Sequence, residues 1–201
     1  MGVIGGDHSV PFGAIRAHAE RGELGILHID AHADLRDAYE GFACSHASIM
    51  RNVMTRVPGV LRLVQVGIRD VAKSEIDFIA ASNGRIVTHF DERLAEQKLE
   101  GASWRVLCDA IVADLPPRVY VSFDIDGLDP QLCPHTGTPV PGGLSFQEAC
   151  LLLKRVVETG HRIIGFDLNE VAPGPEGDEW DANVAARLLY KLCGWTLRSA
   201  R

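Results

Sequence analysis

The chain has 201 residues, of which 46% are hydrophobic, and it carries a formal net charge of −7. This length and hydrophobic content are sufficient for one domain with a sizeable core. The negative charge argues against a nucleic-acid backbone or an anionic membrane surface as a partner.

The cysteines and the hydropathy pattern indicate the cellular environment. There are five cysteines, an odd number, and no two of them have a CxxC spacing. This favours reduced thiols over a disulfide framework. The sequence shows no signal peptide and no apolar run long enough to span a bilayer. We therefore expect a cytoplasmic protein.

Strands and helices are expected to alternate along the chain. The expected strands are 3–4, 24–29, 60–67, 85–89, 118–123 and 162–168. The expected helices are about 10–20, 46–56, 74–81, 91–99, 103–113, 145–159 and 178–192. Because this alternation has no linker and no internal repeat, it predicts a single domain over 1–201. We expect a three-layer α/β/α sandwich around a mostly parallel sheet.

Acidic and histidine side chains follow three of the expected strands. They are Asp7 and His8 after 3–4, Asp30, His32 and Asp34 after 24–29, and Asp124 and Asp126 after 118–123. Alternate residues of an extended chain point the same way, so Asp30, His32 and Asp34 can converge. Taken alone, this segment fits a solvated acidic turn equally well. The two further strand ends favour a common site, because parallel sheets bind ligands at the carboxyl ends of their strands.

Buried carboxylates are costly unless a cation neutralises them, so the pattern predicts a metal site. Asp30, Asp34, Asp124 and Asp126 carry four negative charges, which two divalent metals neutralise. Ligands that are mostly oxygen, with one imidazole per metal, favour Mn²⁺ over Zn²⁺. Paired metals about 3.5–4 Å apart generate a nucleophile from water at neutral pH. A site that remains net negative attracts a cationic substrate.

Three segments together resemble the signatures of the ureohydrolases, the arginase and agmatinase family. They are Gly-Gly-Asp-His-Ser at 5–9, Asp-Ala-His-Ala-Asp at 30–34 and Ser-Phe-Asp-Ile-Asp-Gly-Leu-Asp-Pro at 122–130. The resemblance covers essentially the whole chain. It implies an arginase-like α/β/α sandwich that holds two Mn²⁺ ions. It also implies hydrolysis of guanidino compounds to urea and an amine.

The resemblance also implies a set of metal ligands. One metal would be held by His8, Asp30, Asp34 and Asp124, and the other by His32, Asp126 and the bridging Asp30 and Asp124. Asp129 lies outside this set and is expected to hold a turn. Asp7 is expected to act as a cap or as an acceptor behind the ligands, and Asp167 also lies behind them. His28 is expected to be a packed core histidine.

Three residues match substrate-handling positions of the family. Glu170 matches the glutamate that binds the guanidinium. A carboxylate is a planar, bidentate hydrogen-bond partner for that group. His46 matches a loop histidine that shuttles protons towards the departing amine; the alternative is a histidine at a helix start with no role. Thr138 matches a position that contacts the substrate, although a loop-shaping role explains it nearly as well. His135, in the same long loop, is a weaker candidate for the pocket mouth.

The implied reaction begins with attack of a hydroxide on the guanidinium carbon, after which Asp34 passes a proton to the leaving nitrogen.

The residues after Asp34 bear on the choice of substrate. Arginases place an Asn where this chain has Arg36, whereas the run 34–41 resembles agmatinases. We therefore expect hydrolysis of agmatine to putrescine and urea, a step of polyamine biosynthesis. Arg36 leaves a guanidino acid open as substrate. The remaining alternatives are a guanidinobutyrase, an arginase, a formimidoylglutamase, an acetyl-amine hydrolase and an inactive paralogue.

The first motif lies almost at Met1, whereas family members carry a substantial segment before it. We expect the N-terminal strand and covering helices of the family to be missing. Either the start codon is misplaced, or the sequence is a fragment, or the protein is a natural short form. The sheet edge beside 3–4 should then expose apolar surface. Such surface is uncommon on stable monomers, so we expect a homo-oligomer or an aggregation-prone chain.

Overall fold

Six parallel strands form the centre of the computed structural model, which describes residues 1–200. Their order across the sheet is β1-β6-β5-β2-β3-β4, and every neighbouring pair is parallel. The strands are β1 Gly2–Ile4, β2 Leu24–Ile29, β3 Val60–Ile68, β4 Ile86–Phe90, β5 Arg118–Asp124 and β6 Arg162–Asn169. The sheet is therefore parallel throughout these residues, and β1 and β4 are its edges.

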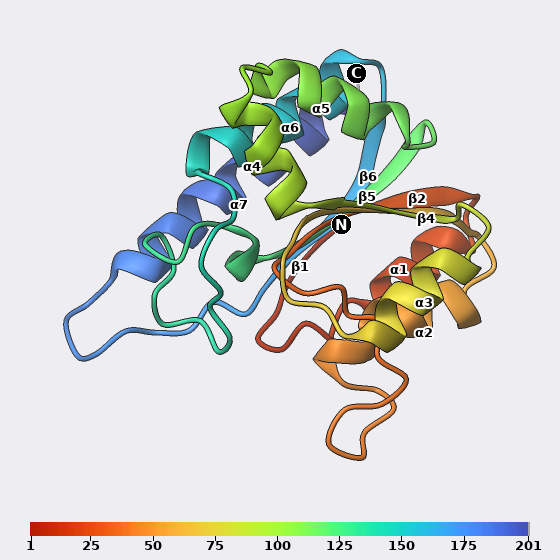
Figure 1. Cartoon of the computed structure of the whole chain (residues 1–201), viewed down its shortest axis with the longest axis horizontal. Coiled ribbons are helices and arrows are strands. Elements are labelled where there is room, and N and C mark those ends of the chain that lie inside the picture. The colour runs from red at the N-terminus through yellow and green to blue at the C-terminus, as the bar shows by residue number, and fades with distance from the viewer. Residues whose placement is uncertain (201) are drawn as a thin grey trace.

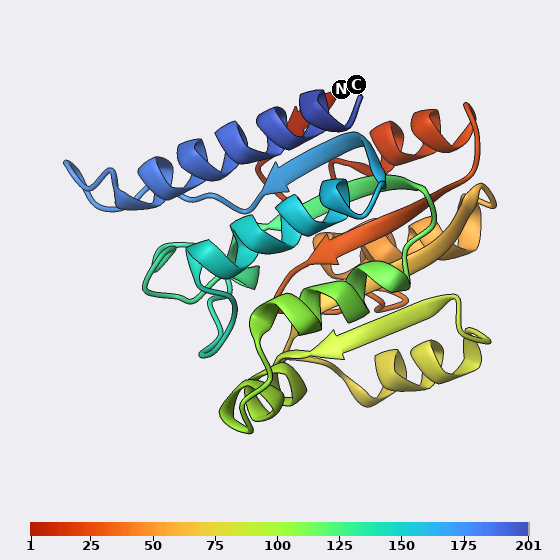
Figure 2. The same ribbon diagram turned by 90° about the horizontal axis from the view of Figure 1, so that it is seen from above.

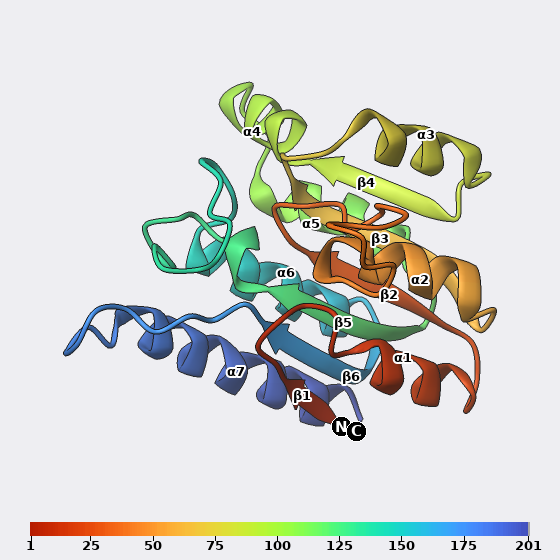
Figure 3. The same cartoon turned by 90° about the horizontal axis from the view of Figure 1, so that it is seen from below.

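Helices cover both faces of the sheet (Figure 1). They are α1 Phe12–Ala19, α2 Ile49–Arg56, α3 Lys73–Ala81, α4 Asp91–Leu99, α5 Trp104–Ala113, α6 Phe146–Glu158 and α7 Trp180–Ser199. Figure 2 looks onto the layer formed by α4 to α7, and Figure 3 looks onto the opposite layer of α1, α2 and α3. This arrangement confirms the predicted three-layer α/β/α sandwich.

The burial of β2 explains why it forms the middle of the sheet. All six of its residues are buried. Leu27 and Ile29 pack in the core cluster beneath α5, α6 and α7, whereas Ile26 packs in the cluster beneath α1 and α2. Since alternate side chains of a strand face opposite sides, one apolar run supplies both layers.

The element boundaries match the sequence prediction within two residues, except at the start of α2, where His46–Ser48 form a 3₁₀ helix before Ile49, and at the end of the last helix. The helix expected to end at residue 192 continues to Ser199. Trp195 packs against the core, and Ser199 Oγ accepts a hydrogen bond of 3.0 Å from the Ile163 amide. The predicted capping box at the start of α6 is present, formed by Ser145 and Glu148.

The carboxyl ends of β1, β2, β5 and β6 meet at one edge of the sandwich, which places the turns after these strands side by side. The turn after β5 is a short 3₁₀ helix, Ile125–Gly127, packed against the end of β2. A side chain at Gly127 would put its Cβ only 2.7 Å from the Asp30 amide nitrogen. Glycine therefore permits this approach. Within residues 1–200, no helix is both long and apolar enough to cross a membrane.

Candidate metal centre and active site

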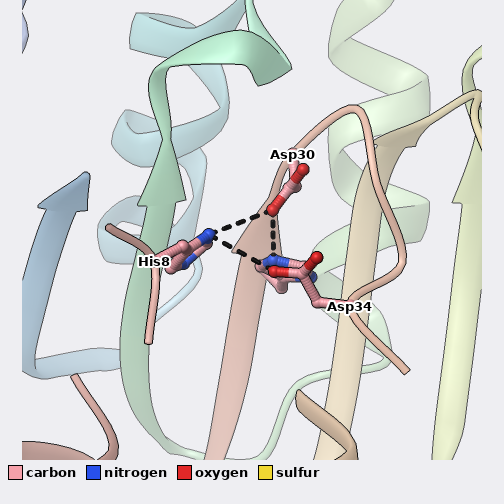
Figure 4. Close-up of side chains that lie close together, drawn as sticks. His8, Asp30 and Asp34 are labelled. Atoms are coloured by element: carbon pink, nitrogen blue, oxygen red, sulfur yellow. Dashed lines mark hydrogen bonds and ion pairs between the residues drawn. The ribbon is translucent and has the colours of Figure 1, made fainter. Parts of the chain in front are cut away.

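The first cluster at this edge surrounds the His8 ring. His8 Nδ1 lies 3.1 Å from Asp30 Oδ2, 3.5 Å from Asp34 Oδ2 and 3.0 Å from Asp124 Oδ2. All four side chains are buried. Figure 4 shows His8 reaching from the turn after β1 towards Asp30 and Asp34. Four residues from three different strand ends thus converge on one point.

A second cluster shares Asp30 with the first. His32 Nδ1 lies 3.1 Å from Asp126 Oδ2 and 3.5 Å from Asp30 Oδ1. One oxygen of Asp30 therefore faces His8 and the other faces His32. This is the arrangement that a carboxylate between two cations would need. Asp124 Oδ1, in contrast, accepts a hydrogen bond of 2.9 Å from the Asp126 amide, so the contacts link it to the first cluster.

Two residues of the site have an unusual backbone. Asp34 has φ 55° and Glu170 has φ 62°, in the left-handed region that non-glycine residues seldom occupy. Hydrogen bonds hold both positions: the Asp34 carbonyl accepts from the Met50 and Arg51 amides, and the Glu170 amide donates to the Gly6 carbonyl at 2.7 Å. Such conformations persist where the surrounding structure imposes them, and they are concentrated at functional sites.

The carboxylates perturb one another in the absence of a cation. Burial and the neighbouring Asp30 charge raise the pKa of both Asp34 and Asp124 well above its usual value. Burial opposes protonation of His32, but Asp126 and Asp30 outweigh it and raise its pKa to about 11. Burial likewise opposes protonation of His8, and hydrogen bonds to Asp124 and Asp30 raise its pKa well above normal.

These residues fit divalent cations. Without a cation, the mutual repulsion favours protons on carboxylates that burial has already desolvated. A divalent ion would replace those protons and satisfy the same oxygens. The donor set consists of carboxylate oxygens and two imidazole nitrogens, the set that Mn²⁺ and related metals accept.

A pocket of about 280 Å³ opens above the clusters. It is lined by Asp7, His8, His32, Asp34, Arg36, Tyr39, His46, Ala47, Asp70, Glu75, Asp124, Gly137, Thr138 and Glu170. The three residues expected to handle substrate are all among them. Glu170 Oε1 accepts a hydrogen bond of 2.7 Å from the His8 amide, and burial raises the pKa of Glu170. Thr138 Oγ1 lies 3.4 Å from Asp126 Oδ2.

His46 is held at the mouth of the pocket by two neighbours. Its Nδ1 lies 3.2 Å from Asp7 Oδ2, and its ring meets the Tyr39 ring edge-on at 5.4 Å between centroids. Asp7 also accepts a hydrogen bond from the Ser9 amide, which agrees with the acceptor role expected for it. Its contact with His46 was not expected from the sequence.

Arg36 is the one arginine in the pocket lining. Its guanidinium lies 5.3 Å from the centre of the Tyr39 ring, and its Nε lies 3.9 Å from Glu75 Oε2. Glu75 is buried and also accepts hydrogen bonds from the Leu35 and Ala72 amides. Glu75 thus holds Arg36 at the pocket wall. It also links α3 to the loop that follows Asp34.

Two expectations need correction. His135 does not reach the pocket mouth, because its Nδ1 pairs with Asp181 Oδ2 at 2.9 Å and its amide donates to Asp181 Oδ1. His28 is buried as expected, but it is more than a packing residue: its Nε2 lies 2.8 Å from Asp30 Oδ2. Asp129 holds a turn as expected, since its Oδ1 accepts a hydrogen bond of 2.8 Å from the Gln131 amide.

The sequence prediction also missed residues that surround the site. Gln65 is buried on β3 and hydrogen-bonds His28, whereas Asp70 and Glu75 line the pocket. A polar residue within the apolar run of β3 is a signal that could have drawn attention to Gln65. No comparable pattern marks Asp70 or Glu75.

A parallel α/β/α sandwich that brings carboxylates and histidines together at the carboxyl ends of its strands agrees with the arginase-like fold and site that the sequence motifs imply. The chain belongs to the arginase family, whose family model matches residues 1–194.

Individual relatives agree with this assignment. The chain is 38% identical to the N(1)-aminopropylagmatine ureohydrolase of Thermus thermophilus, over 96% of this chain and 61% of the relative. It is 33% identical to the agmatinase of Halalkalibacterium halodurans, over 96% and 63% respectively. The structure of proclavaminate amidinohydrolase from Streptomyces clavuligerus superposes with a TM-score of 0.82 at 31% identity, covering 98% of this chain and 64% of that one. The chain thus spans about three fifths of the length of these relatives.

Proposed function

We propose that the protein is a binuclear manganese hydrolase of guanidino compounds, with agmatine as its substrate and putrescine and urea as its products. One observation carries this proposal: Asp30 lies between two histidine and aspartate clusters that open into the same pocket as Glu170. The products would place the reaction in polyamine biosynthesis.

The proposed ligands follow the two clusters. The first metal would be held by His8, Asp30, Asp34 and Asp124, and the second by His32, Asp126, Asp30 and Asp124. The mixture of carboxylate and imidazole donors supports Mn²⁺. When bound, the paired ions supply a nucleophile by lowering the pKa of water to near neutrality.

Glu170 binds and orients the guanidinium of the substrate. Its Oε1 already accepts from the His8 amide, which fixes the carboxylate beside the first cluster. Its partial burial strengthens an ion pair with a cationic guanidinium. Asp34, which lines the same pocket as Glu170, carries a proton to the leaving nitrogen. His46, whose ring is held by Asp7 at the pocket mouth, carries a proton towards the departing amine.

The charge of the pocket supports a cationic substrate. Its lining includes six carboxylates and one arginine, and Arg36 is itself close to Glu75. Even with two divalent ions bound at the clusters, Asp7, Asp70 and Glu170 remain as negative groups at the wall. A substrate with a guanidinium at one end and an ammonium at the other matches this distribution. The relatives named for agmatine and aminopropylagmatine agree with it.

A guanidino acid is a second candidate substrate, and Arg36 favours it. The Arg36 guanidinium lies in the pocket wall and could bind a carboxylate at the far end of the substrate. Replacing it in Arg36→Gln distinguishes the candidates. If the substrate is agmatine, kcat/KM for agmatine is retained or rises. If it is a guanidino acid such as guanidinobutyrate, kcat/KM for that acid falls and agmatine stays a poor substrate.

The deciding experiment is urea release by the purified, Mn²⁺-loaded chain from agmatine, aminopropylagmatine, guanidinobutyrate and arginine. We expect agmatine to have the highest kcat/KM. Release of formamide, ammonia or acetate from formimino or acetyl substrates, without urea from any guanidino compound, would replace the proposal with another hydrolase class. Two bound Mn²⁺ ions without any turnover would indicate a metal-binding paralogue without activity.

The cellular setting and the assembly state stay predictions. A cytoplasmic location is consistent with the hydropathy pattern, and fractionation tests it. A homo-oligomer is consistent with exposed apolar side chains beside β1, where Met1 is 69% exposed and Ile4 is 67% exposed. Sedimentation velocity of the purified chain measures its mass in solution and shows whether it is a monomer.

A further inference from the structure

A row of five polar side chains crosses the sheet one layer beneath the proposed metals. Strand pairing aligns them: Thr88 on β4 is the register partner of Gln65 on β3, which is the partner of His28 on β2, then Ser122 on β5 and Asp167 on β6. Four of the five are fully buried, and Thr88 at the edge is partly exposed. We call these five residues the polar row.

Buried polar side chains cost free energy unless they are hydrogen-bonded, so their contacts need an explanation. The contacts divide the polar row into two arms. One arm runs from Thr88 through Gln65 and His28 to Asp30, and the other from Asp167 through Ser122 to His8. Each arm therefore ends on a proposed metal ligand.

The orientation of the Gln65 amide follows from its partners. Its Nε2 lies 2.7 Å from the Ala33 carbonyl oxygen, which can only accept, so this atom is the NH₂ group. Its Oε1 accepts from Thr88 Oγ1 at 2.9 Å. The same Nε2 lies 3.0 Å from His28 Nδ1 and donates its second proton there.

The tautomer of His28 follows in turn. Because Nδ1 accepts from Gln65, the ring proton of His28 is on Nε2. His28 Nε2 then donates to Asp30 Oδ2 at 2.8 Å. Gln65 thus orients Asp30 through His28, and also holds the backbone at Ala33, between His32 and Asp34.

The second arm determines the tautomer of His8 in the same way. Ser122 Oγ donates its proton to Asp167 Oδ1 at 2.9 Å. It therefore accepts from His8 Nε2, also at 2.9 Å. With the proton of the neutral ring on Nε2, His8 Nδ1 presents its lone pair to the point where Asp30, Asp34 and Asp124 converge.

We propose that the polar row is a positioning device for the metal centre: Gln65 and His28 orient the Asp30 carboxylate, and Asp167 and Ser122 orient His8 so that its Nδ1 faces the proposed metal. This inference rests on the metal centre of the proposed function. It adds His28, Gln65 and Ser122 as positioning residues that touch neither substrate nor the reacting atoms.

The test is the affinity of the full chain for Mn²⁺, measured from the electron paramagnetic resonance signal of free Mn²⁺ without any substrate. Loss of a partner behind a metal ligand costs about 10–100-fold in metal affinity. We therefore expect His28→Phe and Ser122→Ala each to weaken Mn²⁺ binding by about 10–100-fold. We also expect both to alter the spin-coupled signal of the bound pair.

Two further variants separate positioning from general destabilisation. His28→Gln retains an amide nitrogen near the place of His28 Nε2, so it should bind Mn²⁺ more tightly than His28→Phe. Val64→Ala makes a cavity at the neighbour of Gln65 on the same strand, but on the opposite face, in the core beneath α5 and α6. It should unfold at a lower temperature and still bind Mn²⁺ like the original chain.

Unchanged Mn²⁺ affinity in both His28→Phe and Ser122→Ala would overturn the proposal. Equal weakening by Val64→Ala, or no recovery in His28→Gln, would also overturn it. If His28→Phe does not fold, Ser122→Ala decides alone, since it removes a single oxygen atom. A chain that binds two Mn²⁺ ions but releases no urea would contradict the proposed function and leave this inference standing.

Discussion

Three carboxylates of the site use one oxygen each to accept a backbone amide proton. Asp30 Oδ1 accepts from the His32 amide at 2.6 Å, Asp124 Oδ1 from the Asp126 amide, and Asp126 Oδ1 from the Ala31 amide. These bonds orient the side chains before any cation arrives. The site therefore depends on individual residues whose rotamers the turns already restrict.

Removal of a shared carboxylate should abolish the centre. Asp30 faces both histidine clusters, so Asp30→Ala should lose both metals and all activity, and Asp124→Ala should do the same because His8 loses its nearest carboxylate. Metal content by mass spectrometry and urea release measure this. Asp129→Asn is the matched control: its Oδ1 serves only the turn, so it should keep both metals. Loss of metal from that control would show that the ligands are wrongly assigned.

Glu170 should affect turnover without affecting the metals. In Glu170→Gln the amide oxygen can still accept from the His8 amide, so the loop and both ions are retained. The variant loses the negative charge opposite the guanidinium, and with it the binding energy of that ion pair. Turnover should therefore fall about tenfold or more. Steady-state kinetics with metal analysis on the same sample test it. Unchanged kinetics would leave Glu170 without a role in binding.

Metal uptake should release protons. In the metal-free protein the pKa of His32 is raised to about 11 and that of His8 well above normal. Near neutral pH both rings are therefore positively charged, with a proton on each nitrogen. Each must become neutral to bind a metal, and the raised pKa values of Asp34 and Asp124 add to the competition. Apparent affinity for Mn²⁺ should therefore rise with pH. Calorimetry in two buffers of different ionisation enthalpy measures the protons released; identical heats would contradict this.

At the scale of elements, the turn after β5 has to approach β2 closely. Gly127 lies against the backbone of Ile29 and Asp30, where a Cβ would be 3.0 Å from the Ile29 carbonyl carbon and 2.7 Å from the Asp30 nitrogen. The strand end that carries Asp124 and the strand end that carries Asp30 are thus held together by the absence of a side chain.

Gly127→Ala should therefore weaken both the fold and the site. The methyl group would force β2 and the turn apart, and such overpacking costs about 1–3 kcal/mol of stability. Because the displaced atoms carry Asp30 and Asp126, Mn²⁺ affinity should fall as well. Urea denaturation and Mn²⁺ titration measure the two effects. Gly137→Ala is the control, since a Cβ there meets no atom within 4 Å, and it should change neither quantity.

At the scale of the whole molecule, the centre joins strands that are distant in sequence. The clusters connect the ends of β1, β2 and β5, and Glu170 adds the end of β6. A group of buried like charges opposes this assembly unless cations neutralise it. Metal binding should therefore stabilise the entire sandwich and not only its loops.

Mn²⁺ should raise the melting temperature of the chain. A ligand at about 100 times its Kd adds about 2.7 kcal/mol to the free energy of unfolding. At about 2–4 °C per kcal/mol for a chain of this size, the increase should be about 5–10 °C. Calorimetry with Mn²⁺ and with a chelator measures it. Asp124→Ala should show no such increase, and a shift of equal size in that variant would indicate binding elsewhere.

The alternating strands and helices and the proposed metal ligands could be predicted from the sequence, because apolar periodicity and the spacing within a motif are local properties. Asp30, His32 and Asp34 lie within five positions, and a strand end brings such residues together without reference to the rest of the chain. The contact of His135 with Asp181 could not be predicted in this way. It removes His135 from the pocket, and it depends on where the start of α7 lies in the folded chain.

The polar row was decided by the tertiary structure alone. His28, Gln65 and Ser122 lie on three strands, far apart in the chain, and each is a single polar residue in an apolar run. The bond between Gln65 and His28 exists because β3 pairs with β2 in this register, and the bond between Ser122 and Asp167 exists because β5 pairs with β6. Strand order and register arise from packing and crossover geometry, which no local pattern encodes. The sequence by itself therefore determined which residues could bind metal, and the sheet determined which residues hold them in place.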